Sequence, residues 1–116
     1  MLNKLKGDIG EDAAAKFLDK KGFKIVERNF KSKLGEIDIV ALDGDTLVFV
    51  EVKTRTTAKF GLPREAVDFN KQQKLIKNAL YYIQTTNAYK LKKRFDVVEI
   101  LDEKITYIPN AFEVNY

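Results

Sequence analysis

Hydrophobic and polar positions along this chain follow a helical period in two segments and a strand pattern in the segments between and after them. Gly22 supplies a stop after the first helical segment, and Asp43-Gly44-Asp45 is a strong hairpin turn. The pattern predicts the following elements: helices over residues 3–21 and 64–85, and strands over residues 23–30, 35–42, 46–54, 94–101 and 104–108.

The order of these elements predicts the fold. Short links join the first three strands, which favours an antiparallel meander, and the helical segment after the third strand favours a right-handed parallel crossover to the fourth. The unbroken apolar run Leu47–Val50 predicts a central strand covered on both faces. We therefore expect an α/β fold, a mixed β-sheet flanked by helices in the order α-β-β-β-α-β-β, as a single domain over residues 1–116.

The second predicted helix contains a polar residue on its apolar side. Its expected buried face is formed by Phe69, Leu75, Ile76, Ala79, Leu80 and Ile83. Gln72 falls within the same arc, and a buried amide needs hydrogen-bond partners. It either reaches polar groups of a functional site or caps a backbone group at the edge of the sheet.

Composition narrows the chemistry. The 116 residues include 21 Lys plus Arg and 17 Asp plus Glu, a net charge of +4, with neither Cys nor His. Disulfides, thiolate catalysis and imidazole ligands are thereby excluded, and any bound metal must be held by oxygens, which favours Mg²⁺ or Mn²⁺. No apolar stretch approaches the roughly 20 residues of a membrane span, and the N-terminus lacks the apolar core of a signal peptide, so we expect a cytoplasmic protein without a membrane partner.

Three charged residues occupy strand positions where charge is costly. Asp38 lies between two isoleucines, Glu51 lies between two valines, and Lys53 follows on the same face as Glu51. If the strands of Asp38 and Glu51 are neighbours, two carboxylates and an ammonium meet on one sheet face, which suits a divalent cation and a phosphodiester. Taken singly, each acid is equally well explained by a salt bridge at a strand end, and Lys53 by pairing with Glu51.

Two further acids lie close to this face. Glu11 falls at the edge of the buried face of the first helix, where it either reaches the sheet or is an ordinary boundary residue favoured by the helix dipole. Glu36 shares the face of Asp38, and a solvated strand-end residue is the favoured interpretation over a further ligand.

Basic residues gather near the predicted site. Arg55, Lys59 and Arg64 flank the loop after the third strand, and Lys71 lies on the second helix. Contacts from such residues to DNA phosphates would make binding depend on salt and would not distinguish one base sequence from another. Lysines on a helix, however, usually only form its solvent-exposed face. Asp96, next to Arg94, is expected to form a structural pair with an arginine.

These motifs support a family resemblance. Asp38 followed by Glu51-Val52-Lys53 resembles the PD-(D/E)xK, or restriction-endonuclease-like, nuclease superfamily, with Ile37 in place of the proline that names it. A wider set of strings resembles the YraN-like family of presumed endonucleases over nearly the whole chain: Gly10-Glu11, Arg28-Asn29, Gly35-Glu36-Ile37-Asp38, Phe49-Val50-Glu51-Val52-Lys53, Arg55, Lys71-Gln72, Arg94-Phe95-Asp96 and Asn110-Ala111-Phe112.

The resemblance implies roles for individual residues. Asp38 and Glu51 would bind Mg²⁺ or Mn²⁺, and Lys53 would serve catalysis. Glu11 matches the helix glutamate that archaeal Holliday-junction resolvases place beside the metal, and Gln72 matches a helix position that often completes such sites.

The function expected from the resemblance is a metal-dependent DNA endonuclease, with branched or damaged duplexes among its substrates. Junction-cutting relatives act as two-fold dimers, so a homodimer is the candidate assembly, while the oligomeric state itself stays open. Two alternatives stay open: a nucleic-acid-binding module that keeps the nuclease fold without cutting, and a structural domain whose charges are paired internally.

Overall fold

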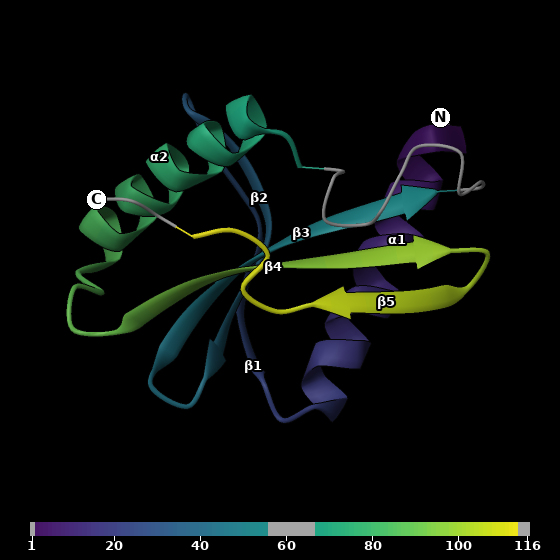
Figure 1. Ribbon diagram of the computed structural model, residues 1–116, viewed down its shortest axis with the longest axis horizontal. Helices are drawn as coiled ribbons and strands as arrows, with labels where there is room; N and C mark the ends of the chain where they lie inside the picture. The colour runs from purple at the N-terminus through teal and green to yellow at the C-terminus, as the bar shows by residue number, and fades with distance from the viewer. Residues whose placement is uncertain (1, 56–66, 114–116) are drawn as a thin grey trace.

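The computed structural model describes residues 2–55 and 67–113, with side chains from residue 9 onward. Figure 1 shows the elements in chain order: α1 (Leu2–Lys20), β1 (Lys24–Ser32), β2 (Gly35–Asp43), β3 (Thr46–Arg55), α2 (Phe69–Thr86), β4 (Lys92–Leu101) and β5 (Lys104–Ile108). The predicted order α-β-β-β-α-β-β is confirmed. Neither of the two described helices is long and apolar enough to cross a membrane.

The strands form one sheet in the order β1-β2-β3-β4-β5. The pairs β1–β2, β2–β3 and β4–β5 are antiparallel, whereas β3 and β4 run parallel with α2 between them in the chain. The predicted meander, the parallel crossover and the central position of β3 are therefore confirmed. Figure 1 shows this sheet with α1 behind it and α2 above its opposite side.

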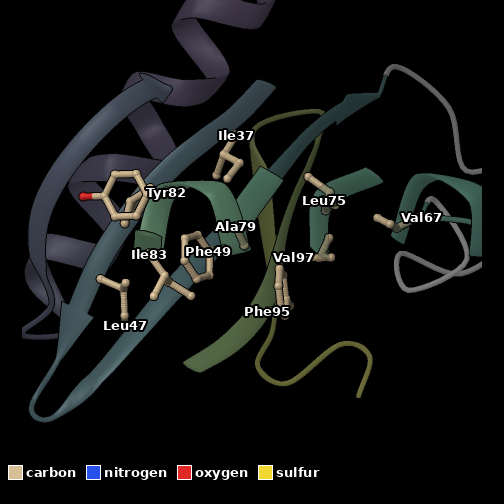
Figure 2. Packing of buried hydrophobic residues seen from close by; sticks show 11 residues of the cluster. Ile37, Leu47, Phe49, Val67, Leu75, Ala79, Tyr82, Ile83, Phe95 and Val97 are labelled. Carbon is tan, nitrogen blue, oxygen red and sulfur yellow. The ribbon is translucent and has the colours of Figure 1, made fainter. Parts of the chain in front are cut away.

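The face of the sheet that α2 covers holds an aromatic core (Figure 2). Its buried residues are Ile37, Val40, Leu47, Phe49, Val67, Leu75, Ala79, Tyr82, Ile83, Phe95 and Val97. Tyr82 of α2 meets Phe49 edge-to-face at 5.9 Å between ring centroids, and Phe49 stacks on Phe95 at 5.4 Å. The contact between Tyr82 and Phe49 packs α2 against β3, and the Phe49–Phe95 stack continues this aromatic cluster to β4.

The opposite face packs against α1 through a second core. Its buried members are Ala14, Leu18, Phe23, Ile39, Ala41, Val48, Val50, Val98 and Ile100. Gly10 lets α1 approach β3 closely, because a Cβ at this position would overlap Thr54 Oγ1. The sheet is thus covered on both sides, as the apolar run in β3 predicts.

Two details of the predicted second helix are wrong. Within the described residues α2 begins at Phe69, not at residue 64, because Asp68 is the N-cap and accepts a hydrogen bond from Lys71 N at 2.8 Å. Phe69 and Leu80 are 69% and 46% exposed rather than buried. The helix turns Asn78 and Tyr82 inward instead, since the ring of Tyr82 fills the space beside Phe49.

The predicted structural role of Asp96 is confirmed. This carboxylate is buried on β4 and accepts hydrogen bonds from Arg94 Nε at 2.9 Å and Nη2 at 3.1 Å. It also accepts from the Tyr107 hydroxyl and from Asn110 N, so its charge is fully used inside the fold.

Candidate metal and nucleic-acid site

Asp38 and Glu51 lie where β2 and β3 separate. Ile39 and Val50 are the last registered pair of these strands, and Asp38 and Glu51 are the next residue on each strand. Asp38 Oδ2 accepts a hydrogen bond from Val52 N at 2.8 Å, so its carboxylate takes the place of a backbone acceptor at the end of the ladder. The adjacency predicted for these two acids is therefore present.

Both carboxyl groups are held in a setting that disfavours charge. Burial, followed by the negative charge of Glu51, raises the pKa of Asp38 from its ordinary value of 3.8 to about 7, against the stabilising Val52 N–H. Burial also raises the pKa of Glu51, which is 7% exposed, although Lys71 and Lys53 oppose that rise. Shifts of this kind in neighbouring acids are typical of functional sites.

Two ammonium groups meet the same carboxylate oxygen. Lys53 Nζ lies 3.7 Å from Glu51 Oε1, and Lys71 Nζ from α2 lies 3.5 Å from it. Glu51 and Lys53 therefore share a sheet face as predicted, and the simpler expectation that Lys53 pairs with Glu51 also holds. Lys71, expected only as a phosphate contact, belongs to the same cluster.

Glu11 is linked to this cluster through Asn29. With its amide nitrogen turned toward the acids, Asn29 donates to Glu11 Oε1 at 2.7 Å and to Glu36 Oε1 at 3.2 Å. Glu36 is exposed, as favoured, and its charge raises the pKa of both Asp38 and Glu51. In the part of the chain that the structure describes, no three acidic side chains converge as a metal-holding group, and the predicted ligand role of Glu11 stays a prediction.

Of the other predicted site residues, the structure describes Gln72 and Arg55 but not Lys59 and Arg64. Gln72 Nε2 donates to the carbonyl oxygen of Val67 at 2.9 Å, so a backbone group satisfies the amide, and its catalytic role also stays a prediction. Arg55 Nε lies 3.6 Å from Glu99 Oε2 at the end of β3. Lys59 and Arg64 lie outside the described residues, so their predicted phosphate contacts stay predictions.

Glu99 and Asn29 were missed as members of the site. Glu99 is 4% exposed on β4, directly opposite Lys53 in the parallel register. A Glu within the apolar run 97–100, combined with the predicted parallel pairing, was the available signal. Asn29 interrupts a strand with a left-handed backbone (φ 55°), and a mid-strand Asn was its signal.

Fold and site together define a mixed α/β protein with a charged cluster at one end of its sheet. Comparison with known sequences then identifies its family. The chain belongs to the family described as "Uncharacterised protein family UPF0102", whose family model matches residues 10–100. The YraN-like resemblance is confirmed at this level.

Relatives from three bacteria match over almost their full lengths, and each carries the name UPF0102 protein. The chain is 52% identical to one of Caldanaerobacter subterraneus over 113 residues, covering 91% of this chain and 93% of the relative. It is 49% identical to one of Clostridioides difficile, covering 97% and 100% respectively. It is 40% identical to one of Persephonella marina, covering 100% of both.

Proposed function

We propose that this protein is a metal-dependent DNA endonuclease of the PD-(D/E)xK kind. The observation that carries the proposal is the carboxyl pair of Asp38 and Glu51 on adjacent strands, with Lys53 on Glu51. Keeping the half-buried carboxyl of Asp38 beside the buried Glu51 is unfavourable when both are charged, in keeping with a raised pKa of about 7 for Asp38. A fold that retains such a pair usually uses it for binding or chemistry.

The residues fit a hard divalent cation. Carboxylate oxygens are the ligands that Mg²⁺ and Mn²⁺ prefer, and Mg²⁺ is commonly held by one or two carboxylates with waters and substrate phosphates. A cation between Asp38 and Glu51 would offset the burial and the repulsion from Glu51 that together raise the pKa of Asp38. Binding requires both carboxyls to ionise, so affinity should rise with pH.

The roles of the side chains follow from these positions. A bound cation would supply charge neutralisation on the phosphate and an acidified water. Lys53, which lies 3.7 Å from Glu51, would orient the attacking water or stabilise charge on the phosphate. Glu11 and Gln72 would support the site from α1 and α2, and Arg55, Lys59, Arg64 and Lys71 would hold the DNA backbone. The proposed setting is the cytoplasm.

A second candidate function is a DNA-binding module that does not cut. Two observations favour it: lysines already neutralise Glu51, and the described acids form no three-carboxylate metal group. Cleavage decides between the two candidates, because both bind DNA.

The first test is cation binding. Thermal unfolding with increasing Mn²⁺ should raise the Tm of the wild type by mass action and leave Asp38→Asn unchanged. Asparagine keeps an acceptor for Val52 N, so the strand end is preserved while the charge is lost. No shift in the wild type would remove the metal from the proposal.

The second test is cleavage of branched, nicked, duplex and single-stranded DNA. Lys53→Ala should keep Mn²⁺ and DNA binding but lose about 100-fold or more in rate, because it removes a group that acts in the transition state. Lys92→Ala, which removes an exposed lysine paired with Asp45 near the start of β4, is the matched control. Cutting by Lys53→Ala at the control rate would refute the role of Lys53, and absence of cutting by the wild type would favour the binding module.

A further inference from the structure

We propose that Lys71 is a movable counter-ion that couples cation binding to DNA binding. Without a cation its ammonium rests on Glu51; when a cation binds, the ammonium is released and takes a DNA phosphate. This inference rests on the proposed function and deepens it, because it assigns a coupling residue to the same site.

The backbone of Lys71 is held in the first turn of α2, whereas its side chain is partly exposed to solvent. Its backbone N–H donates to the N-cap Asp68 at 2.8 Å in the first turn of α2. Its side chain is 42% exposed, and Nζ lies 3.5 Å from Glu51 Oε1, where it donates a hydrogen bond to this carboxylate. A long lysine side chain on a rigid helix start can exchange one anion for another at low cost.

The charges of the cluster favour this exchange. Three carboxylates, those of Glu36, Asp38 and Glu51, act on one another, and Lys53 and Lys71 act against them. A divalent cation between Asp38 and Glu51 would reverse the local charge balance. Lys71 is the more exposed of the two lysines, so the added charge would displace it first.

A pocket that could take a DNA phosphate lies beside Lys71. A small pocket of about 70 Å³ is lined by Leu34, Gly35, Glu36, Lys71, Lys74 and Leu75. Lys71 and Lys74 flank this pocket from successive turns of α2. A phosphate of the DNA backbone there would meet two lysines as soon as Lys71 leaves Glu51.

Coupling of this kind is reciprocal. If the cation frees Lys71 for DNA, DNA must tighten cation binding by the same factor. Removing the Lys71 charge should therefore strengthen cation binding to the free protein, because a competing positive charge is gone. The same change should reduce the factor by which DNA and cation help each other.

The experiment measures Ca²⁺ binding by calorimetry, with and without a DNA duplex whose integrity is checked on a gel. Ca²⁺ uses the same oxygen ligands as Mg²⁺. Lys71→Met should bind Ca²⁺ severalfold more tightly than the wild type without DNA and lose most of the gain that DNA gives. Lys77→Met removes one exposed charge from the same helix, outside the lining of this pocket, and should keep the wild-type coupling. Lys71→Arg should keep part of it.

The outcomes separate the inference from the proposed function. Ca²⁺ binding by the wild type, with equal coupling in Lys71→Met and Lys77→Met, would overturn the role of Lys71 and leave the endonuclease proposal standing. Unchanged or weaker Ca²⁺ binding by Lys71→Met would do the same. Absence of Ca²⁺ binding by the wild type would overturn both.

Discussion

At the scale of single residues, the carboxyl group of Asp38 is subject to opposing effects. Burial and Glu51 raise its pKa to about 7, while the Val52 N–H stabilises its anion. With a pKa of about 7, this carboxyl would be the group for which a proton and the proposed cation compete near neutral pH. This competition makes both stability and cation affinity depend on pH.

We predict that ionisation of Asp38 destabilises the cation-free protein. Its folded-state pKa lies above the ordinary 3.8, so the folded state binds more protons between about pH 4 and 7, and stability falls as pH rises. Between pH 5 and 8 the wild type should lose roughly 2–3 kcal/mol relative to Asp38→Asn. Urea unfolding in EDTA measures the difference, and a constant gap between the two proteins would contradict it.

Asn29 makes a prediction that separates backbone from side chain. Its φ of 55° is costly for most residues but free for glycine, and its amide bridges Glu11 and Glu36. Asn29→Ala should destabilise the fold by about 1–2 kcal/mol. Asn29→Gly should cost clearly less in urea unfolding, because it loses only the bridge. Equal losses would show that the left-handed backbone is not what Asn29 supplies.

At the scale of elements, the hydrophobic pattern predicts most of the fold because both helices and the strands β2, β3 and β4 each bury apolar residues. The meander, the parallel crossover and the central β3 follow from link lengths and from the run Leu47–Val50. The start of α2 does not follow from the apolar pattern. Asp68, the N-cap, has an extended backbone, and a periodic pattern of apolar residues does not show where such a cap stands. Phe69, one residue later, is consequently too early in the helix to reach the core.

The candidate site is predicted less completely. Asp38, Glu51 and Lys53 could be placed from strand alternation and neighbouring strands alone. Lys71 and Glu99 reach the same region only through the packing of α2 and the register of β4 on β3, which depend on the whole core. Asn29 reaches Glu11 through a left-handed residue, which breaks the alternation on which the sequence argument depends.

The contact between α1 and β3 gives a prediction at this scale. Gly10→Ala would place a methyl group against Thr54 Oγ1 and should destabilise the protein by about 1–3 kcal/mol. In Gly10→Ala with Thr54→Ala the nearest remaining atom is Thr54 Cβ at 3.5 Å, an ordinary contact. The double variant should therefore recover most of the loss in thermal unfolding. Failure to recover would place the strain elsewhere.

At the scale of the whole molecule, charge is used differently toward the two ends of the sheet. Toward the starts of β3 and β4, Arg94 pairs with Asp43 and Asp96, and Lys92 pairs with Asp45. Toward the end of β3, the acids have raised pKa values and share their lysines. A modest net charge of +4 can therefore still present a local binding surface.

We predict that DNA binding depends on salt through the second of these regions. Replacing Arg55, near Glu99 at the end of β3, by methionine should reduce the slope of log K against log salt by about 0.9, one phosphate contact. Lys92→Met removes the same charge near the start of β4 and should leave the slope unchanged. Fluorescence anisotropy at about 50–200 mM salt, without divalent cation, measures both. Equal slopes would exclude Arg55 from the DNA contact.

The hydrogen bond from Val52 N to Asp38 also affects how related sequences with replaced site residues should be interpreted. A relative without the proposed cleavage activity would still need an acceptor for Val52 N where β2 and β3 separate, and would tend to keep Asp38 for this structural reason. The described contacts of Glu51 are ion pairs with Lys53 and Lys71, and burial of its charge is unfavourable. If the proposed cleavage were lost, we would therefore expect replacement at position 51 before replacement at position 38.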